Sequence, residues 1–121
     1  MGEHNLTGRK GENIAEQFLA GRGYRIIRRN WRSGRYEIDL IAEKDGYLVI
    51  VEVKTRHKNY IESPLESVNL KKQGFLIRAA NAYIRKNKTD LEVRFDIVTV
   101  VISENEHNVE LTENAFYPLL R

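Results

Sequence analysis

The sequence predicts an α/β fold in which a mixed β-sheet of four to five strands is flanked by α-helices. Apolar residues recur at helical spacing in residues 8–22 and 66–87. The remaining apolar stretches are rich in β-branched and aromatic residues, which favour strands. Short turn sequences that contain glycine separate the first three of these stretches from one another. At 121 residues the chain is long enough for one modest core, so we expect a single domain over residues 1–121.

Two segments are expected to form amphipathic helices. In residues 8–22, Ala15, Phe18 and Leu19 form an apolar stripe, and Gly23 supplies the usual C-terminal stop. Residues 66–87 predict a longer helix. Its three alanines would let it lie close to a sheet, while its basic residues face outward or gather at its C-terminal end.

The expected strands form a meander followed by a crossover. The meander comprises residues 24–31, 36–43 and 47–55, and the Asp-Gly turn before its last strand is a strong hairpin signal. The third strand should be central, because LVIVEV is apolar on both faces. Residues 93–102 follow the long helix and should pair in parallel with it. Residues 109–112 are expected to add a short edge strand, and residues 57–64 to form a loop.

Composition excludes several classes of protein. Hydrophobic residues make up 41% and charged residues 31%, which suits a soluble protein and excludes wholesale disorder. No apolar stretch approaches the ~20 residues of a membrane span, and the start MGEHNLTGRKGEN lacks the apolar segment of a signal peptide. We therefore expect a cytoplasmic protein with no membrane partner. The absence of cysteine excludes disulfides, thiolate metal sites and a cysteine nucleophile.

The net charge of +3 is unevenly distributed. Residues 1–90 carry seven more basic than acidic side chains, whereas residues 91–121 carry four more acidic than basic ones. A basic body favours a polyanionic partner. Scattered solvated charges explain the same count equally well, so charge alone does not decide the function.

Three charged residues interrupt otherwise apolar strands. Glu52 and Lys54 lie two positions apart, so their side chains share one face of the strand, with Cα atoms about 7 Å apart. Asp39 lies in the preceding strand, and the hairpin brings it towards Glu52. Two neighbouring carboxylates repel unless a proton or a cation lies between them. A magnesium ion suits such a site, since it takes one or two carboxylates and keeps positions for water and a phosphate.

Glu12 is a further acidic candidate, on the first helix. It is three residues before Ala15 and seven before Leu19, which places it at the rim of the buried stripe. A glutamate there is costly to bury without a partner. The alternative is a glutamate in the first turn that is favoured only by the helix dipole.

The ordered set of motifs resembles a known family over roughly residues 8–100. The set resembles the bacterial YraN family and consists of Gly11-Glu12, Glu37-Ile38-Asp39-Leu40-Ile41, Val51-Glu52-Val53-Lys54-Thr55-Arg56, Lys72-Gln73 and Arg94-Phe95-Asp96. That family is similar to the archaeal Holliday junction resolvases of the restriction-endonuclease-like superfamily, whose members share an Asp…Glu-x-Lys motif. Tyr36 departs from the family pattern, which usually has glycine at this position.

The resemblance implies a restriction-endonuclease-like fold and a set of site residues. Asp39 and Glu52 would bind the metal, Lys54 would be the catalytic lysine, and Glu12 would be the acid carried by the helix. It also implies an Mg²⁺- or Mn²⁺-dependent endonuclease that hydrolyses DNA, with branched DNA as a candidate substrate and a homodimer as the expected assembly. Basic residues expected to contact DNA phosphates are Arg9, Lys10, Arg25, Arg28, Arg29, Arg32, Arg35, Arg56 and Lys72.

Two other functional classes are compatible with the sequence. One is a catalytically inactive module that binds nucleic acid in DNA processing or repair, and the other is a structural or protein-interaction domain without DNA affinity. Structural interpretations are preferred for some residues. We expect Asp96 to bond to the backbone or to Arg94, Trp31 to pack in the core, and His57 and Tyr60 to lie in an ordinary surface loop.

Overall fold

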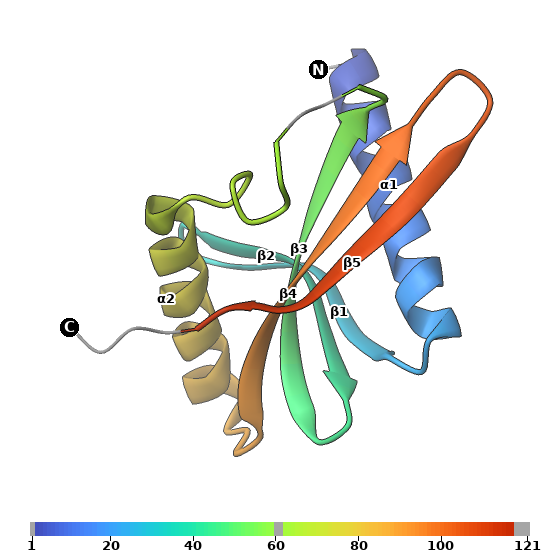
Figure 1. The fold of residues 1–121 in the computed structure, drawn as a ribbon. Helices are drawn as coiled ribbons and strands as arrows, with labels where there is room; N and C mark the ends of the chain where they lie inside the picture. The colour runs from blue at the N-terminus through green and yellow to red at the C-terminus, as the bar shows by residue number, and fades with distance from the viewer. Residues whose placement is uncertain (1, 60–61, 118–121) are drawn as a thin grey trace.

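A computed structural model describes residues 2–59 and 62–117 of the chain (Figure 1). The order of its elements is α1 (Gly2–Gly21), β1 (Arg25–Ser33), β2 (Tyr36–Lys44), β3 (Tyr47–His57), α2 (Leu70–Asn87), β4 (Glu92–Ile102) and β5 (His107–Phe116). The predicted loop after β3 includes Tyr60, which lies outside the described residues. Within the described part of the chain, no helix is both long and apolar enough to cross a membrane.

The five strands form one mixed sheet in the order β1-β2-β3-β4-β5. The first three strands are an antiparallel meander, as predicted, and β3 is the central strand. The chain then crosses over through α2, so that β4 pairs with β3 in parallel from Tyr47↔Glu92 to His57↔Ile102. The turn between β2 and β3 has positive φ at both Asp45 and Gly46, as a tight two-residue hairpin requires.

The two helices cover opposite faces of the sheet (Figure 1). Ala15 and Leu19 of α1 pack with Val49 and Val98 in one core. The other core lies under α2, and there Leu76 packs with Phe95 among other buried residues. Trp31 belongs to this second core and meets Tyr83 edge to face at 5.4 Å, as expected for a structural tryptophan. The predicted fold class, a mixed α/β sheet flanked by helices, is therefore confirmed.

Both helices begin at positions other than those predicted. Helix α1 starts at Gly2 and not at residue 8, although it ends as expected before Gly23, whose φ is +89°. Helix α2 starts at Leu70 and not at residue 66. The side chain of Asn69 accepts a hydrogen bond from the Lys72 amide, and this cap starts the helix four residues later than the apolar pattern indicates.

The last strand is longer than the short edge strand predicted at residues 109–112. Strand β5 extends to Phe116, which stacks on Phe95 with ring centroids 4.8 Å apart. Within this stretch the Asn114 amide donates to Asp96 Oδ1 at 3.0 Å. These tertiary contacts hold a polar sequence in the sheet that has little strand propensity of its own.

A buried polar network around Asp96 joins three parts of the fold. The Asp96 carboxylate accepts hydrogen bonds from Tyr24 Oη, from Arg94 Nε and Nη2, and from the Asn114 amide. Arg94 Nη2 also donates to Tyr24 Oη at 2.9 Å and lies 3.4 Å from Glu113 Oε1. Burial, reinforced by the negative charge of Asp96, raises the pKa of Tyr24 well above its usual range. The predicted pairing of Asp96 with Arg94 is confirmed.

We expect Asp96→Ala to destabilise the protein strongly. Removal of the carboxylate leaves the Arg94 guanidinium with a side chain only 11% exposed and without its main partner. Breaking a buried pair in this way costs about 3–5 kcal/mol. Chemical denaturation followed by circular dichroism measures this change in the free energy of unfolding.

Thr99→Val is the matched control for this experiment. Thr99 is also buried on β4, but its hydroxyl has no hydrogen-bond partner within residues 2–59 and 62–117. Replacing an unsatisfied buried hydroxyl should leave stability unchanged or raise it by about 1 kcal/mol. Equal destabilisation by both substitutions would contradict the importance assigned to the Asp96 network.

Candidate active site

The candidate site begins where β2 and β3 separate. Their ladder runs from Lys44↔Tyr47 to Leu40↔Val51. Beyond this point the Val53 backbone amide donates a hydrogen bond to Asp39 Oδ2 at 2.8 Å. A side-chain oxygen thus accepts the hydrogen bond that a backbone carbonyl of β2 would accept in a continuous ladder. The carboxylate of Asp39 thus satisfies a backbone amide of β3 that no longer pairs with β2.

A cleft of about 570 Å³ lies beside this separation. Its walls come from the N-terminal part of α1, the start of β2, the end of β3 and the first turn of α2. The lining residues are Gly8, Glu12, Glu37, Asp39, Glu52, Val53, Lys54, Thr55, Arg56, His57 and Lys72. All four residues predicted to carry chemistry, from three separate elements, therefore face the same cleft.

Glu52 lies at the centre of the charged contacts in this cleft. Its residue is only 6% exposed, and its Oε2 atom lies 3.3 Å from Lys54 Nζ. Lys72 of α2 approaches the same oxygen, with its Nζ atom 3.8 Å away. The predicted placement of Glu52 and Lys54 on one face of β3 agrees with this geometry, and Lys72 connects the long helix to the same carboxylate.

Asp39 carries a negative charge that its surroundings disfavour. Burial raises the pKa of Asp39 to about 7, and the neighbouring charge of Glu52 adds to this effect. Glu12 acts in the same direction, while the hydrogen bond from the Val53 amide and the charge of Lys72 act against it. The carboxylates of Asp39, Glu52 and Glu12 are thus close enough to interact, as the sequence indicated for the first two.

A close contact between α1 and β3 brings Glu12 to the cleft. A Cβ atom at Gly11 would collide with Oγ1 of Thr55, and it would lie 3.3 Å from Thr55 Cβ. Only glycine allows the helix backbone to approach the strand this closely. Because Glu12 follows Gly11, the same contact fixes the distance of its side chain from β3.

The donors in this cleft suit a hard divalent cation. Within the described residues, no three His, Asp or Glu side chains already form a ready metal cluster. Magnesium does not require one, since it commonly takes one or two protein carboxylates and completes its shell with water and substrate oxygens. Burial and the charge of Glu52 both raise the pKa of Asp39, so its ionised form is disfavoured, and a bound cation would favour that form.

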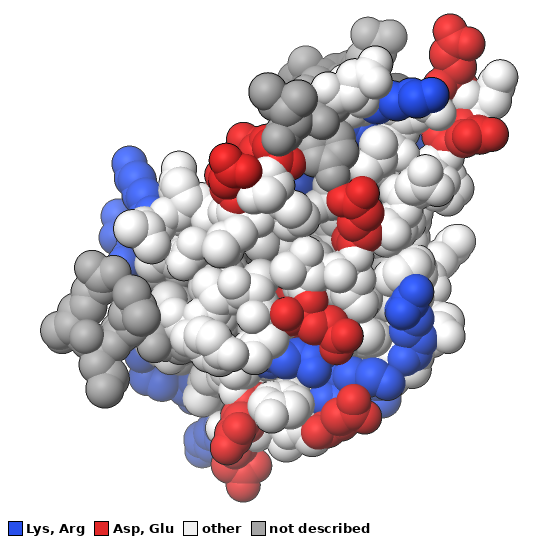
Figure 2. Space-filling model, viewed as in Figure 1, with Lys and Arg blue, Asp and Glu red and all other residues white. Residues whose placement is uncertain are grey.

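The basic residues expected to contact DNA are divided among several surfaces. Arg56 and Lys72 line the cleft, whereas Arg9 and Lys10 are exposed on α1. Arg29 pairs with Glu16, and Arg32 lies 3.6 Å from Glu37. Figure 2 shows Lys and Arg side chains along the edge that α2 forms, while acidic side chains lie over the β4–β5 side.

Two ionisable residues that line the cleft, Glu37 and His57, were not among the site residues predicted from the sequence. Glu37 lies two positions before Asp39 on β2, and alternation along the strand could have indicated it. His57 ends β3 and lines the cleft, where a surface-loop position was expected. The longer β3 explains this difference, because its parallel pairing with β4 continues to His57↔Ile102.

Comparison with known proteins relates the chain to one protein family. The model of the uncharacterised protein family UPF0102 matches residues 11–100. A UPF0102 protein of Bacteroides thetaiotaomicron is 45% identical over 120 residues, which cover 99% of both chains. A UPF0102 protein of Flavobacterium psychrophilum is 44% identical over 97% of this chain and 98% of its own. One from Phocaeicola vulgatus is 42% identical over 98% of each.

The pKa of Asp39 predicts a pH-dependent stability of the metal-free protein. Between its usual pKa of 3.8 and its folded value of about 7, Asp39 is protonated in the folded state but ionised in the unfolded state. Its contribution to stability therefore decreases as pH rises through this interval. We expect the stability of Asp39→Asn, relative to the unsubstituted protein, to increase from pH 4.5 to pH 8. Thermal unfolding of both proteins in EDTA, at each pH, measures this difference in stability.

Asp45→Asn is the control, because Asp45 lies in the β2–β3 turn with a side chain 72% exposed. This substitution should change the stability of the protein by the same small amount at every pH. A stability difference between Asp39→Asn and the unsubstituted protein that is constant across pH would contradict the electrostatic description of the cleft.

We also expect Gly11→Ala to cost about 1–3 kcal/mol, because the added methyl group overpacks the contact with Thr55. Gly8→Ala is the matched control on the same helix, since a Cβ atom there would meet nothing within 4 Å. That change should stabilise the helix by about 0.5–1 kcal/mol. The double variant Gly11→Ala/Thr55→Ala should recover part of the loss, and an additive result would show that the two residues do not meet.

Proposed function

The chain belongs to the uncharacterised protein family UPF0102, and from its cleft we propose that it is a metal-dependent endonuclease that hydrolyses phosphodiester bonds in DNA. The observation that carries the proposal is the meeting of Asp39, Glu52 and Lys54 at the point where β2 and β3 separate. Two acids on neighbouring strands and a lysine beside one of them are the parts that metal-assisted phosphodiester hydrolysis needs.

The path of the chain supports a relationship to the restriction-endonuclease-like superfamily. A helix bearing Glu12 precedes the antiparallel meander, and the meander carries the Asp…Glu-x-Lys residues on β2 and β3. A helix crossover then leads to the parallel strand β4. We infer this relationship from the motif and the strand order together, since α/β folds in general host many unrelated activities.

In the proposed reaction Asp39 and Glu52 hold Mg²⁺ or Mn²⁺, with Glu12 and Glu37 at the edge of the same cleft. A bound divalent ion supplies a Lewis acid for the phosphate and lowers the pKa of a coordinated water. Lys54 places a positive charge beside Glu52, where it can stabilise the charge that develops on the phosphate or orient the attacking water. Water is the nucleophile, and no covalent intermediate with the protein forms.

Basic residues around the cleft support a polyanionic substrate. Arg56 and Lys72 line the cleft itself, and Arg9 and Lys10 extend the positive charge along the exposed side of α1. Such side chains neutralise phosphates without reading bases, so they favour recognition of shape over sequence. By analogy with the resolvases that the sequence resembles, we propose branched DNA as the substrate and a homodimer as the active form.

We expect the purified protein to cleave labelled DNA with Mg²⁺ or Mn²⁺ and not with EDTA. Glu52→Gln should reduce the rate at least about 100-fold, because metal stabilisation of the transition state is worth several kcal/mol and each 1.4 kcal/mol is about tenfold. DNA affinity measured by gel shift should be retained. Four-way junction, duplex and single-stranded DNA are compared to identify the substrate.

Glu43→Gln is the control variant, since it removes the same charge from β2 at an outer ion pair with Arg25. It should leave both cleavage and binding unchanged. Metal-dependent binding without cleavage of any of the three DNAs would reject the enzyme and favour the binding module. Absence of binding even at low salt would reject both and favour a structural domain.

A further inference from the structure

Helix α2 carries an unusual charge for a helix on the protein surface. Its 18 residues, LKKQGFLIRAANAYIRKN, contain five basic side chains and no acidic one. Surface helices commonly mix both signs, and opposite charges spaced four apart stabilise them. Arg85 and Lys86 in the last turn stabilise the helix through its dipole, but Lys71 and Arg78 lie too far from that end to do so.

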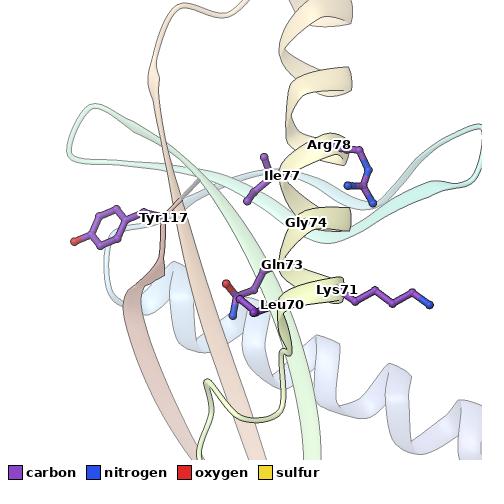
Figure 3. Close-up of a pocket in the computed structure, with 7 residues that line it drawn as sticks. All are labelled: Leu70, Lys71, Gln73, Gly74, Ile77, Arg78 and Tyr117. Atoms are coloured by element: carbon purple, nitrogen blue, oxygen red, sulfur yellow. The ribbon is translucent and has the colours of Figure 1, made fainter. Parts of the chain in front are cut away.

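Two of these basic residues project from the same side of α2. Lys71 and Arg78 are exposed, and Figure 3 shows both extending away from the side of the helix that faces Tyr117. A Cβ atom at Gly74, between them along this side, would lie 3.4 Å from Arg78 Nη1. Within the described ranges, no carboxylate lies within ion-pair distance of Lys71 or Arg78. The two cations thus lie on either side of Gly74, the one position between them that carries no side chain.

An aromatic ring lies beside these cations. Phe75 is partly exposed and packs against Tyr36 of β2, with ring centroids 5.4 Å apart and planes tilted by 55°. Lys72 Nζ lies 5.3 Å from the centre of the Phe75 ring. A hollow of about 300 Å³ joins the ring to the cations, and its walls are Asn69, Lys71, Lys72, Phe75 and Arg78. We call these five residues the α2 hollow.

The α2 hollow is adjacent to the candidate active site. Lys72 lines both the hollow and the cleft, and its Nζ atom lies 3.8 Å from Glu52 Oε2 and 5.3 Å from the centre of the Phe75 ring. A nucleic-acid strand whose phosphate occupies the cleft would therefore reach the α2 hollow with the neighbouring nucleotides. Lys71 and Arg78 are placed to meet its phosphates, and Phe75 to meet a base.

We propose that the α2 hollow binds an unpaired segment of nucleic acid next to the bond that the cleft would cleave. A base in a duplex is stacked between its neighbours and cannot lie flat against Phe75, whereas an unpaired base can. The combination of a basic path and a partly exposed aromatic ring is the usual means of holding single strands without sequence preference. This inference rests on the proposed function and adds to it a substrate class, a junction between paired and unpaired strands.

The test is a binding titration in EDTA, where cleavage cannot occur. The probes are a fluorescently labelled duplex, the same duplex with a single-stranded extension, and the extension alone, each made as DNA and as RNA. Phe75→Leu keeps an apolar side chain against Tyr36 and should weaken binding of both probes with unpaired segments about 5- to 100-fold. Affinity for the plain duplex should be unchanged. A 2-aminopurine base in the extension should be quenched by stacking when the unsubstituted protein binds, and this quenching should be lost with Phe75→Leu.

Lys71→Gln/Arg78→Gln provides a second variant on exposed positions, which keeps the test valid if Phe75→Leu unfolds. It should weaken binding of the unpaired probes and reduce the dependence of their affinity on salt. The matched control is Arg85→Gln/Lys88→Asn, which removes two charges from the other end of α2. Lys88 has φ of +52°, a conformation that asparagine tolerates. This control should bind like the unsubstituted protein.

Equal loss with the control variant, or equal loss on duplex and unpaired probes, would overturn the inference. Unchanged binding by the folded Phe75→Leu and Lys71→Gln/Arg78→Gln variants would also overturn it. Failure of the nuclease proposal is a separate result, because it appears as absent cleavage with metal while these binding differences persist. Comparable differences with DNA and RNA would show that the α2 hollow recognises unpaired bases and not the sugar.

Discussion

The hydrogen bond from the Val53 amide to Asp39 is the contact on which the candidate site depends. A β-strand that leaves its neighbour exposes amide groups that must find another acceptor. Here the acceptor is the carboxylate of Asp39. The hydrogen bond that satisfies β3 where it separates from β2 therefore also holds this carboxylate at the cleft. The same separation leaves Glu52 and Lys54 without a β2 strand beside them and open to the cleft.

The two helices, on opposite faces of the sheet, bring opposite charges to this point. Glu52 is buried and pairs with Lys54 on its own strand and with Lys72 on α2. Asp39 receives less compensation, and Glu12 from α1 adds a further negative charge. The cleft is therefore neutralised on the side of α2 and left acidic on the side of α1. This asymmetry places the acidic and the basic side chains of the cleft on different sides of it.

Local sequence signals predicted much of the fold. The Asp45-Gly46 turn, the apolar strand LVIVEV and the stop at Gly23 each act through residues close in the chain, and the structure has all three. The parallel pairing of β4 followed from the intervening helix. The length of β5 depended on contacts between residues far apart in the chain, such as Phe95 with Phe116, which no local pattern contains. The start of α2 at Leu70 is set by a local cap, in which the Asn69 side chain accepts from the Lys72 amide, and the apolar pattern did not indicate it. The motif residues of the cleft were predicted because strand alternation fixes which face a side chain takes. The division of the basic residues among separate surfaces was not predicted, because it depends on how α1 and β1 pack.

The parallel pairing of β3 with β4 bears on how the candidate site forms during folding. The meander that holds Asp39, Glu52 and Lys54 joins strands adjacent in sequence, so its loop closures are short and entropically cheap. Lys72 reaches Glu52 only when α2 packs against the sheet, and β4 pairs with β3 only after the chain has passed through α2. Non-local pairing of this kind is slow compared with hairpin formation. A nascent chain would thus bring Asp39 and Glu52 together before the compensating lysine of α2 arrives.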